Sequence, residues 1–273
     1  MDEAGLSRDA FLGGALRIWQ PLSGYRAGVD PVLLAAAVPA EPGQSVLELG
    51  CGVGVAALCL GRRVPGLHLS GVEMQPAYAD LARRNAADAG LPLEVTVADL
   101  TALPSALRQR QFDHVMATPP YFQRDRSTPA ADAGRETALG EGTSLADWVA
   151  VAARRVVQGG HVTFIQRVAR APELIGVMPA RRGSVVLLPL IPRRGRDARR
   201  VLSRGRKGGR AAFRLADSVL LHDGDTHNGD RDDYSAVASA VLRGGAALRF
   251  LRGTTLRCNL LLGICLPYVA DAA

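Results

Sequence analysis

The sequence predicts an α/β fold with a mainly parallel, seven-stranded sheet, helices on both faces and an antiparallel hairpin at one edge. Five short apolar runs alternate with helical runs between residues 45 and 166, which is the pattern of strands joined by crossover helices. A glycine-rich turn follows the first run. Polar residues end the first four runs, and ligands of such folds bind at the carboxyl ends of the strands.

The segment before the sheet, residues 16–34, reads L-R-I-W-Q-P-L-S-G-Y-R-A-G-V-D-P-V-L-L. Its two glycines and its second proline predict a loop followed by a short helix over residues 31–38. Asp30 would be the N-cap of this helix and Pro31 its first residue, as both residue types prefer. The simplest interpretation of Tyr25, Arg26 and Asp30 is therefore a well-capped helix start.

The first strand and its turn, residues 45–54, read S-V-L-E-L-G-C-G-V-G, and a helical run follows at residues 55–60. Glycines between a strand and a helix let the backbone approach a cofactor, with the amide groups of the helix N-terminus pointing at it. The dinucleotide fingerprint is G-x-G-x-x-G. The G-x-G-x-G spacing found here disfavours NAD.

Further strands are expected at residues 67–72, 93–97, 112–117 and 161–166, and helices at 75–89 and 145–157. Ser144 is the expected N-cap of the second helix, and Gly159-Gly160 its stop. Runs at 184–191 and 199–203, joined by the basic turn 192–198, predict the edge hairpin. Residues 222–233 resemble a calcium loop but lack its final glutamate, so we expect a turn before a helix at 235–242. The polar stretch 122–143 is expected to be a lid or binding loop.

Composition indicates a globular protein. The chain has 273 residues, of which 48% are apolar, enough for one large domain with a buried core. The four cysteines form no C-x-x-C pair and show no metal-ligand spacing, so we expect a reducing compartment, the cytoplasm, and no metal. Residues 1–10 lack the basic start and apolar core of a signal peptide. The longest apolar run, near 259–270, is about half of a membrane span.

The net charge of +7 is concentrated in one segment. Residues 181–210 hold 11 of the 33 basic residues and one of the 26 acidic residues, so they carry +10 and the remainder carries −3. An arginine-rich patch of this kind suits contacts with nucleic-acid phosphates, although it could also be a solvated face. The residues expected to bind RNA are Arg193, Arg194, Arg196, Arg199, Arg200, Arg204, Arg206, Lys207 and Arg210.

Three acidic residues end strands that meet at one edge of the predicted sheet: Glu48, Glu73 and Asp99. Glu73 lies about twenty residues after the glycines, the spacing at which an acid binds the two hydroxyls of a ribose. Asp99 is placed to accept a hydrogen bond from the exocyclic amine of an adenine. Each acid alone could be a helix cap or a solvated strand end, but together they predict a nucleoside-bearing cofactor.

The E-x-G-x-G-x-G pattern after an apolar strand resembles motif I of the class I S-adenosylmethionine (SAM) methyltransferases. The resemblance implies a Rossmann-like methyltransferase fold with SAM as cofactor. The residues that it implies for cofactor binding at the strand ends are Glu48, Gly50, Cys51, Gly52, Gly54, Glu73, Met74, Asp99 and Leu100.

The fourth strand ends in Thr118-Pro119-Pro120-Tyr121, which resembles the [D/N/S]-P-P-[Y/F/W] motif of methyltransferases that act on a planar amino nitrogen. Such a nitrogen is a poor nucleophile because its lone pair is delocalised, so the site must position it and accept its N–H groups. In that family the first side chain and the carbonyl of the next proline accept these bonds, and the aromatic ring stacks on the base. Thr118 departs from the usual asparagine, which makes a slower or inactive site an alternative.

Five segments together resemble the bacterial tRNA adenine-N6 methyltransferases that modify the adenine 3′ of the anticodon in a valine tRNA. They are residues 19–34, 47–54, 98–100, 118–122 and 188–193, and the resemblance covers about 16–245. It implies that Arg26 and Asp30 contribute to the SAM pocket. The expected division is an N-terminal segment, 1–40, that contributes to this pocket, a methyltransferase domain, 41–245, and an atypical C-terminal tail, 246–273.

The resulting expectation is a SAM-dependent enzyme that methylates the N6 amine of a tRNA adenine of the anticodon-loop position 37 type. Two alternatives remain. A protein glutamine N5-methyltransferase would use the same P-P-Y chemistry, although such enzymes carry a substrate domain ahead of the SAM fold, where this chain has about forty residues. A non-catalytic relative would keep the fold and bind SAM or RNA without transferring a methyl group.

Overall fold

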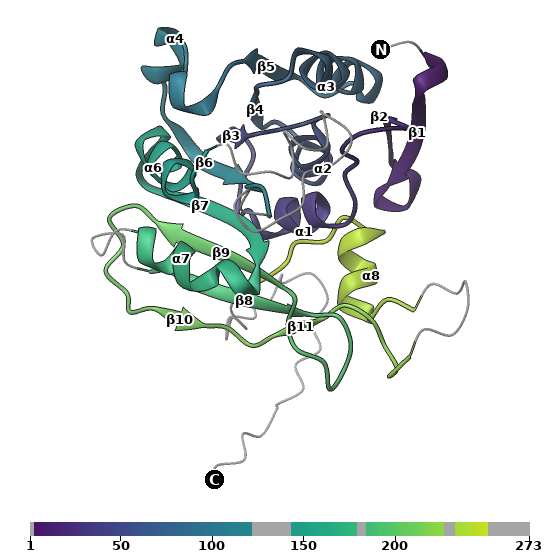
Figure 1. The fold of residues 1–273 in the computed structure, drawn as a ribbon, viewed down its shortest axis with the longest axis vertical. Helices are drawn as coiled ribbons and strands as arrows, with labels where there is room; N and C mark the ends of the chain where they lie inside the picture. The colour runs from purple at the N-terminus through teal and green to yellow at the C-terminus, as the bar shows by residue number, and fades with distance from the viewer. Residues whose placement is uncertain (1–2, 122–142, 179–183, 227–232, 251–273) are drawn as a thin grey trace, which may run out of the picture.

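The computed structural model describes residues 3–121, 143–178, 184–226 and 233–250. Nine strands form one sheet in the order β10-β8-β9-β7-β6-β3-β4-β5, with β11 pairing β8 (Figure 1). Strands β3 to β7 are mutually parallel, and β9 is antiparallel to β7 and to β8. The strands are β3 Ser45–Leu49, β4 His68–Glu73, β5 Leu93–Val97, β6 Phe112–Ala117, β7 Val156–Arg167, β8 Val186–Ile191, β9 Arg200–Arg206, β10 Arg214–Leu215 and β11 Val219–Leu220.

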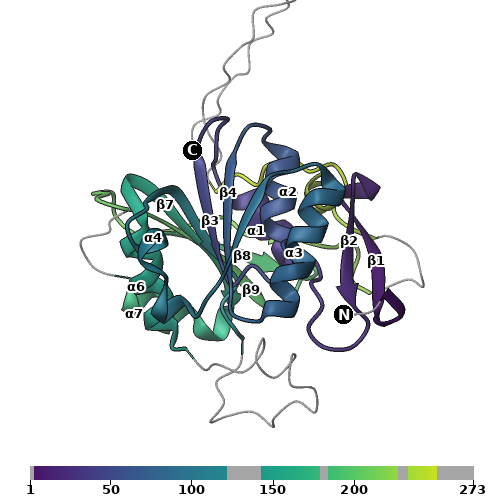
Figure 2. The same cartoon turned by 90° about the horizontal axis from the view of Figure 1, so that it is seen from above.

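Helices cover both faces of this sheet, as the alternation of the sequence predicts (Figure 2). One face carries α1 Asp30–Ala37, α2 Val55–Arg63 and α3 Pro76–Ala89, and the other carries α4 Ser105–Arg108, α6 Leu145–Arg155 and α7 Ala171–Val177. Helix α8, Ala236–Leu242, packs against α1. Short 3-10 helices lie at Glu3–Gly5, Leu12–Gly14, Leu100–Ala102 and Val168–Arg170. None of the described helices has the length and hydropathy needed to cross a membrane.

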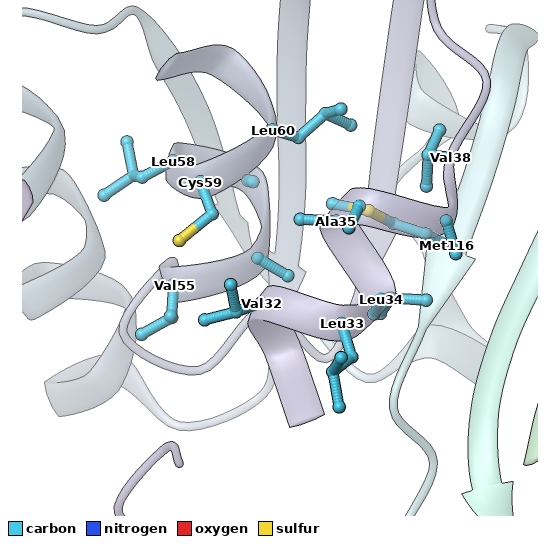
Figure 3. Close-up of a cluster of buried hydrophobic side chains, with 14 of the residues drawn as sticks. Val32, Leu33, Leu34, Ala35, Val38, Val55, Leu58, Cys59, Leu60 and Met116 are labelled. Atoms are coloured by element: carbon cyan, nitrogen blue, oxygen red, sulfur yellow. The ribbon is translucent and has the colours of Figure 1, made fainter. Parts of the chain in front are cut away.

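Two buried hydrophobic clusters lie on the two faces because successive residues of a strand point to opposite sides. Val46 belongs to the first cluster and Leu47 to the second. In the first cluster, Val32 of α1 lies beside Val55 of α2 (Figure 3). Met116 of β6 is fully buried near α1. The core therefore fixes α1 and α2 against the strands whose ends form the site.

The predicted edge hairpin is confirmed as the antiparallel pair β8 and β9, but it is not the edge of the sheet. The short strands β10 and β11 pair in parallel with the outer side of β8. This pairing satisfies the backbone groups that an edge strand would leave exposed.

The expected loop over residues 16–34 is wrong in its first part. Leu16–Pro21 forms β2, which pairs with β1, Leu6–Phe11, in an antiparallel hairpin. The buried amide of Asn85 on α3 accepts the backbone N–H of Trp19 at 2.7 Å and donates to its carbonyl at 3.1 Å. The hairpin is therefore held by a distant helix, which local sequence patterns do not show.

The predicted helix stop at Gly159-Gly160 is also wrong. Helix α6 begins after its predicted cap, Ser144, whose hydroxyl accepts the N–H of Asp147 at 3.2 Å, but it ends at Arg155. Strand β7 then runs through both glycines. A side chain on Gly160 would lie 2.5 Å from the carbonyl oxygen of Asp113 on β6, so the glycine permits close pairing at an irregular point of the ladder.

Three sequence expectations fall wholly or partly outside the described residues. Residues 122–142 of the candidate lid (122–143), residues 251–273 of the tail (246–273) and residues 227–232 of the predicted turn (222–233) lie outside the described part of the chain. The first tail residues pack into the core, since Leu248 and Phe250 are buried and the N–H of Leu248 donates to the carbonyl of Ala36 at 2.7 Å. The division into three parts stays a prediction.

Candidate functional site

A cavity of about 300 Å³ lies at the carboxyl ends of β3, β4, β5 and β6. Twelve of the sequence-predicted site residues line it: Glu48, Gly50, Cys51, Gly52, Glu73, Met74, Asp99, Leu100, Thr118, Pro119, Pro120 and Tyr121. The glycine loop, the strand-end acids and the T-P-P-Y motif therefore meet in one space. Gly54, Arg26 and Asp30 do not line it.

The three glycines of the loop all have positive φ angles, of 65°, 53° and 88°, but they serve different purposes. A Cβ on Gly50 would lie 2.6 Å from the Trp148 ring, and one on Gly54 would lie 3.2 Å from Leu93. A Cβ on Gly52 would meet nothing within 4 Å. Gly50 and Gly54 thus allow packing inside the protein, whereas Gly52 leaves open space in the cavity wall.

Glu48 is a buried carboxylate that accepts the N–H of Ala57, in the first turn of α2, at 2.9 Å. Burial, and to a smaller extent the nearby Glu73, raises its pKa to about 8, against the opposing effect of this hydrogen bond. A cation in the cavity would relieve the cost of keeping this group ionised.

Glu73 is also buried, and each of its oxygens accepts one backbone N–H. Gly52 donates to Oε2 and Gln75 to Oε1, both at 2.9 Å. Burial raises the pKa of Glu73, whereas these hydrogen bonds act to lower it. A carboxylate oxygen has about two lone pairs, so both oxygens retain capacity for donors in the cavity.

At the third acidic strand end, Asp99 accepts the N–H and the hydroxyl of Thr101, both at 2.8 Å. This is the helix-cap role that a single acid commonly has, and one carboxylate oxygen carries both bonds. Met74 and Leu100 also line the cavity, Met74 with 54% of its surface exposed and Leu100 buried.

The T-P-P-Y motif places a buried polar atom in the cavity wall. The Thr118 hydroxyl has no hydrogen-bond partner among the described residues. Leaving such a group unpaired costs about 1–3 kcal/mol, so its pairing with a ligand would be favourable. The carbonyls of Pro119 and Pro120 both accept from the buried side chain of Gln166 on β7.

The structure corrects the placement of Asp30. It begins α1 but makes no cap hydrogen bond, and its carboxylate instead accepts from the Tyr121 hydroxyl and, at 2.7 Å, from Nε of Arg200. Burial, followed by the charge of Asp30, raises the pKa of Tyr121, so the phenol stays protonated. Asp30 thus orients the aromatic residue of the motif and does not line the cavity.

The Arg26 side chain likewise does not line the cavity. Its guanidinium donates to the Ser7 hydroxyl, the carbonyl of Pro21 and, at 2.6 Å, the carboxylate of Asp9. These contacts hold the chain around Arg26 against the N-terminal hairpin of β1 and β2.

Sequence reasoning missed three aromatic residues that line the cavity: Tyr25, Tyr78 and Trp148. The Tyr78 hydroxyl accepts the N–H of Tyr25 at 2.8 Å and so holds the backbone at Tyr25 against α3. Burial and then Asp30 raise the pKa of Tyr25 to about 12. Tyr25 lies in the G-Y-R stretch that the sequence singled out, whereas nothing in the sequence connects Trp148 of α6 with the glycine loop.

The basic residues do not form one patch. Arg200 pairs in register with Arg167 at the carboxyl end of β7, so the β8–β9 turn, with exposed Arg194, Arg196 and Arg199, lies toward the cavity. Arg206 lies about 20 Å from Arg200 along β9, where it pairs in register with His161. Lys207 and Arg210 follow Arg206 in the chain. Arg193 is paired with Asp233, and the Arg204 guanidinium lies 4.4 Å from the Phe250 ring centre.

The chain is similar to known methyltransferases. Residues 46–134 match a family described as a methyltransferase domain. A protein of Aeromonas hydrophila named tRNA1(Val) (adenine(37)-N6)-methyltransferase is 30% identical over 213 residues, which cover 76% of this chain and 86% of that protein. A protein of Yersinia enterocolitica with the same name is 32% identical over 134 residues, 48% of this chain and 53% of that protein.

A solved structure of a protein described as a predicted O-methyltransferase, from Agrobacterium tumefaciens, superposes with a TM-score of 0.65. Its sequence identity is 26%, and the match covers 80% of this chain and 98% of that chain.

Proposed function

Because this chain belongs to the class I SAM-dependent methyltransferases, and among them to the family of the tRNA1(Val) (adenine(37)-N6)-methyltransferases, we propose that it methylates the N6 amine of an adenine in tRNA, at a site of the position 37 type. One observation carries the proposal: the Thr118 hydroxyl, which has no hydrogen-bond partner within the described part of the chain, and the adjoining prolines line the same cavity as the glycine loop and Glu73. This arrangement supports the proposal because the donor and acceptor sites of a methyl transfer would then be contiguous.

The cavity residues fit SAM. Gly52 leaves open space where the cofactor would lie over the loop, and Glu48 and Glu73 are two buried carboxylates that suit a cationic ligand bearing a ribose. Glu73 would accept the ribose hydroxyls, Asp99 would accept the adenine amine, and Glu48 would face the positively charged methionine part. When bound, SAM supplies a methyl group activated by its sulfonium.

The acceptor base would lie against the T-P-P-Y motif. The Thr118 hydroxyl and the Pro119 carbonyl accept the N–H groups of the amine and hold its nitrogen in line for attack, while Tyr121 stacks on the base. Asp30 holds the Tyr121 hydroxyl, and the Arg200 guanidinium lies 5.1 Å from the ring centre. The ring is therefore held in place before the base arrives. Bases of an anticodon loop are unpaired, so the N6 amine can reach the cavity without opening a duplex.

The proposal is tested by incubating the protein with methyl-labelled SAM and bulk tRNA, digesting the RNA and searching the nucleosides for labelled N6-methyladenosine by mass spectrometry. We expect label in that nucleoside. Bound SAM without a labelled nucleoside would contradict the proposal and favour a glutamine side chain or no acceptor at all. A large gain in Thr118→Asn would identify a weakened site, whereas little change would show that threonine suffices.

We expect the basic residues before β9, in the β8–β9 turn, to bind RNA more strongly than the basic residues at and beyond the other end of β9. Replacing Arg194 and Arg196 with glutamine should weaken tRNA binding about tenfold near 0.1 M salt and reduce the slope of log K against log salt by about 1.5, because each lost phosphate contact contributes about 0.7–0.9. Filter binding at several salt concentrations measures both quantities.

The matched control removes two exposed charges at the opposite end, in Arg206→Gln with Arg210→Gln, and should leave tRNA affinity within about twofold. SAM affinity should be unchanged in both variants. Equal losses of tRNA affinity would show that the RNA does not distinguish the two ends.

A further inference from the structure

Gln166 connects the neighbouring strand to the two prolines of the T-P-P-Y motif. It lies near the carboxyl end of β7, beside β6, and is fully buried. Its Nε2 donates to the carbonyls of Pro119 and Pro120, both at 3.2 Å, and its Oε1 accepts the N–H of Arg167 at 2.8 Å. This set fixes the orientation of the amide, because the reversed orientation would place an oxygen against two carbonyls and an NH2 against an N–H.

The two carbonyls are not equally occupied. Pro120 also accepts from Nη1 of Arg170 at 3.1 Å, and that guanidinium is held by Glu173 through both carboxylate oxygens. A carbonyl oxygen has two lone pairs, so these donors use both of those on Pro120. Pro119 accepts only from Gln166 within the described part of the chain and retains one lone pair, and Pro119 lines the cavity.

The prolines give a reason for needing such a donor. Proline has no N–H, so this stretch of backbone cannot be held by its own donors, and its carbonyls are the groups that neighbours can bind. Rotation of the peptide plane would move the Pro119 oxygen away from the acceptor nitrogen. A misplacement of about 1 Å can reduce a rate about 100-fold.

We propose that Gln166 is a positioning residue for methyl transfer: it holds the Pro119 carbonyl so that its remaining lone pair accepts an N–H of the target amine. Arg170 holds Pro120 in the same manner and keeps that carbonyl out of the reaction. The proposal rests on the proposed function, because the amine acceptor defines the direction in which the Pro119 oxygen must point.

The test compares Gln166→Met, which keeps the length and volume but has no donor, with Gln166→Glu, which keeps the acceptor for Arg167 but places oxygens against the carbonyls. The control is Thr163→Val, a buried polar residue on the same strand with no hydrogen bond to the motif. We expect kcat for tRNA methylation to fall about 10- to 100-fold in both Gln166 variants. The Kd for SAM and the KM for tRNA should stay close to those of the control. The melting temperature should fall in both Gln166 variants, because buried hydrogen bonds are lost, and the assay is run at a temperature where both variants are folded.

Crystal structures of the wild type and of Gln166→Met provide a second measurement that requires no acceptor, and the Pro119 carbonyl should change direction between them. A carbonyl that keeps its direction, or a folded variant with kcat within twofold of wild type, overturns the proposal. If the wild type methylates no tRNA while the carbonyl moves as expected, the proposed function fails, and the result that stands is that Gln166 sets the direction of the Pro119 carbonyl.

Discussion

Glu73→Ala should weaken SAM binding by about 10²- to 10⁴-fold. In the proposed complex each oxygen of the Glu73 carboxylate accepts one ribose hydroxyl, and a hydrogen bond to a charged group contributes about 1.5–3 kcal/mol. Two such bonds give about 3–6 kcal/mol, and each 1.4 kcal/mol is about tenfold in affinity. Isothermal titration calorimetry with SAM measures the loss directly.

The control for this prediction is Glu94→Ala. Glu94 lies on the adjacent strand β5, and its side chain is 61% exposed and paired with Arg110 on the surface. Its removal should leave SAM affinity unchanged within about twofold, because Glu94 does not line the cavity. The protein should also stay folded, since an exposed ion pair contributes little to stability. A Glu73→Ala protein that binds SAM as well as this control would show that Glu73 serves only to hold Gly52 and Gln75.

Gly50→Ala should lower the free energy of unfolding by about 2–5 kcal/mol. A left-handed backbone costs a residue with a Cβ about 1–2 kcal/mol, and overpacking of a core costs about 1–3 kcal/mol. Both apply here, because φ is 65° and the new Cβ would lie 2.6 Å from the buried Trp148 ring. Denaturant unfolding with linear extrapolation measures the change.

Gly52→Ala separates the two contributions. Its φ of 53° imposes the same backbone cost of about 1–2 kcal/mol, but its Cβ would meet no protein atom within 4 Å. We therefore expect a smaller loss of stability together with at least about tenfold weaker SAM binding, because the methyl group would occupy cavity space close to the loop. Equal destabilisation in the two variants would mean that Trp148 moves aside and that strain alone matters.

Much of the site could be predicted because its parts are local. An apolar strand, glycines and a following helical run define the loop around Gly52, and parallel strands necessarily end at the same edge of the sheet. Glu48, Glu73, Asp99 and Thr118 each end a strand of this kind, so the order of elements along the chain is sufficient to bring them to one cavity. These placements follow from the pairing of the strands and do not require particular side-chain contacts between distant segments.

The roles of Asp30 and Gln166 could not be predicted in this way. A helix-start pattern makes Asp30 a cap, but its carboxylate binds Tyr121 and Arg200, which lie 91 and 170 residues away in sequence. Gln166 is one polar residue in an apolar strand, and its importance is visible only when the two proline carbonyls are found beside it. The same holds for the basic residues, because the register of β9 places them in two groups at opposite ends of that strand.

The sequence by itself determined the fold class, the methyltransferase family and the group of strand ends that forms the cavity, because periodicity, glycine spacing and short motifs are properties of consecutive residues. Only the tertiary structure decided which partner each buried polar group has. A carboxylate or an amide can satisfy its hydrogen bonds in several ways, and the choice depends on which donors and acceptors the packing of distant elements brings within about 3 Å.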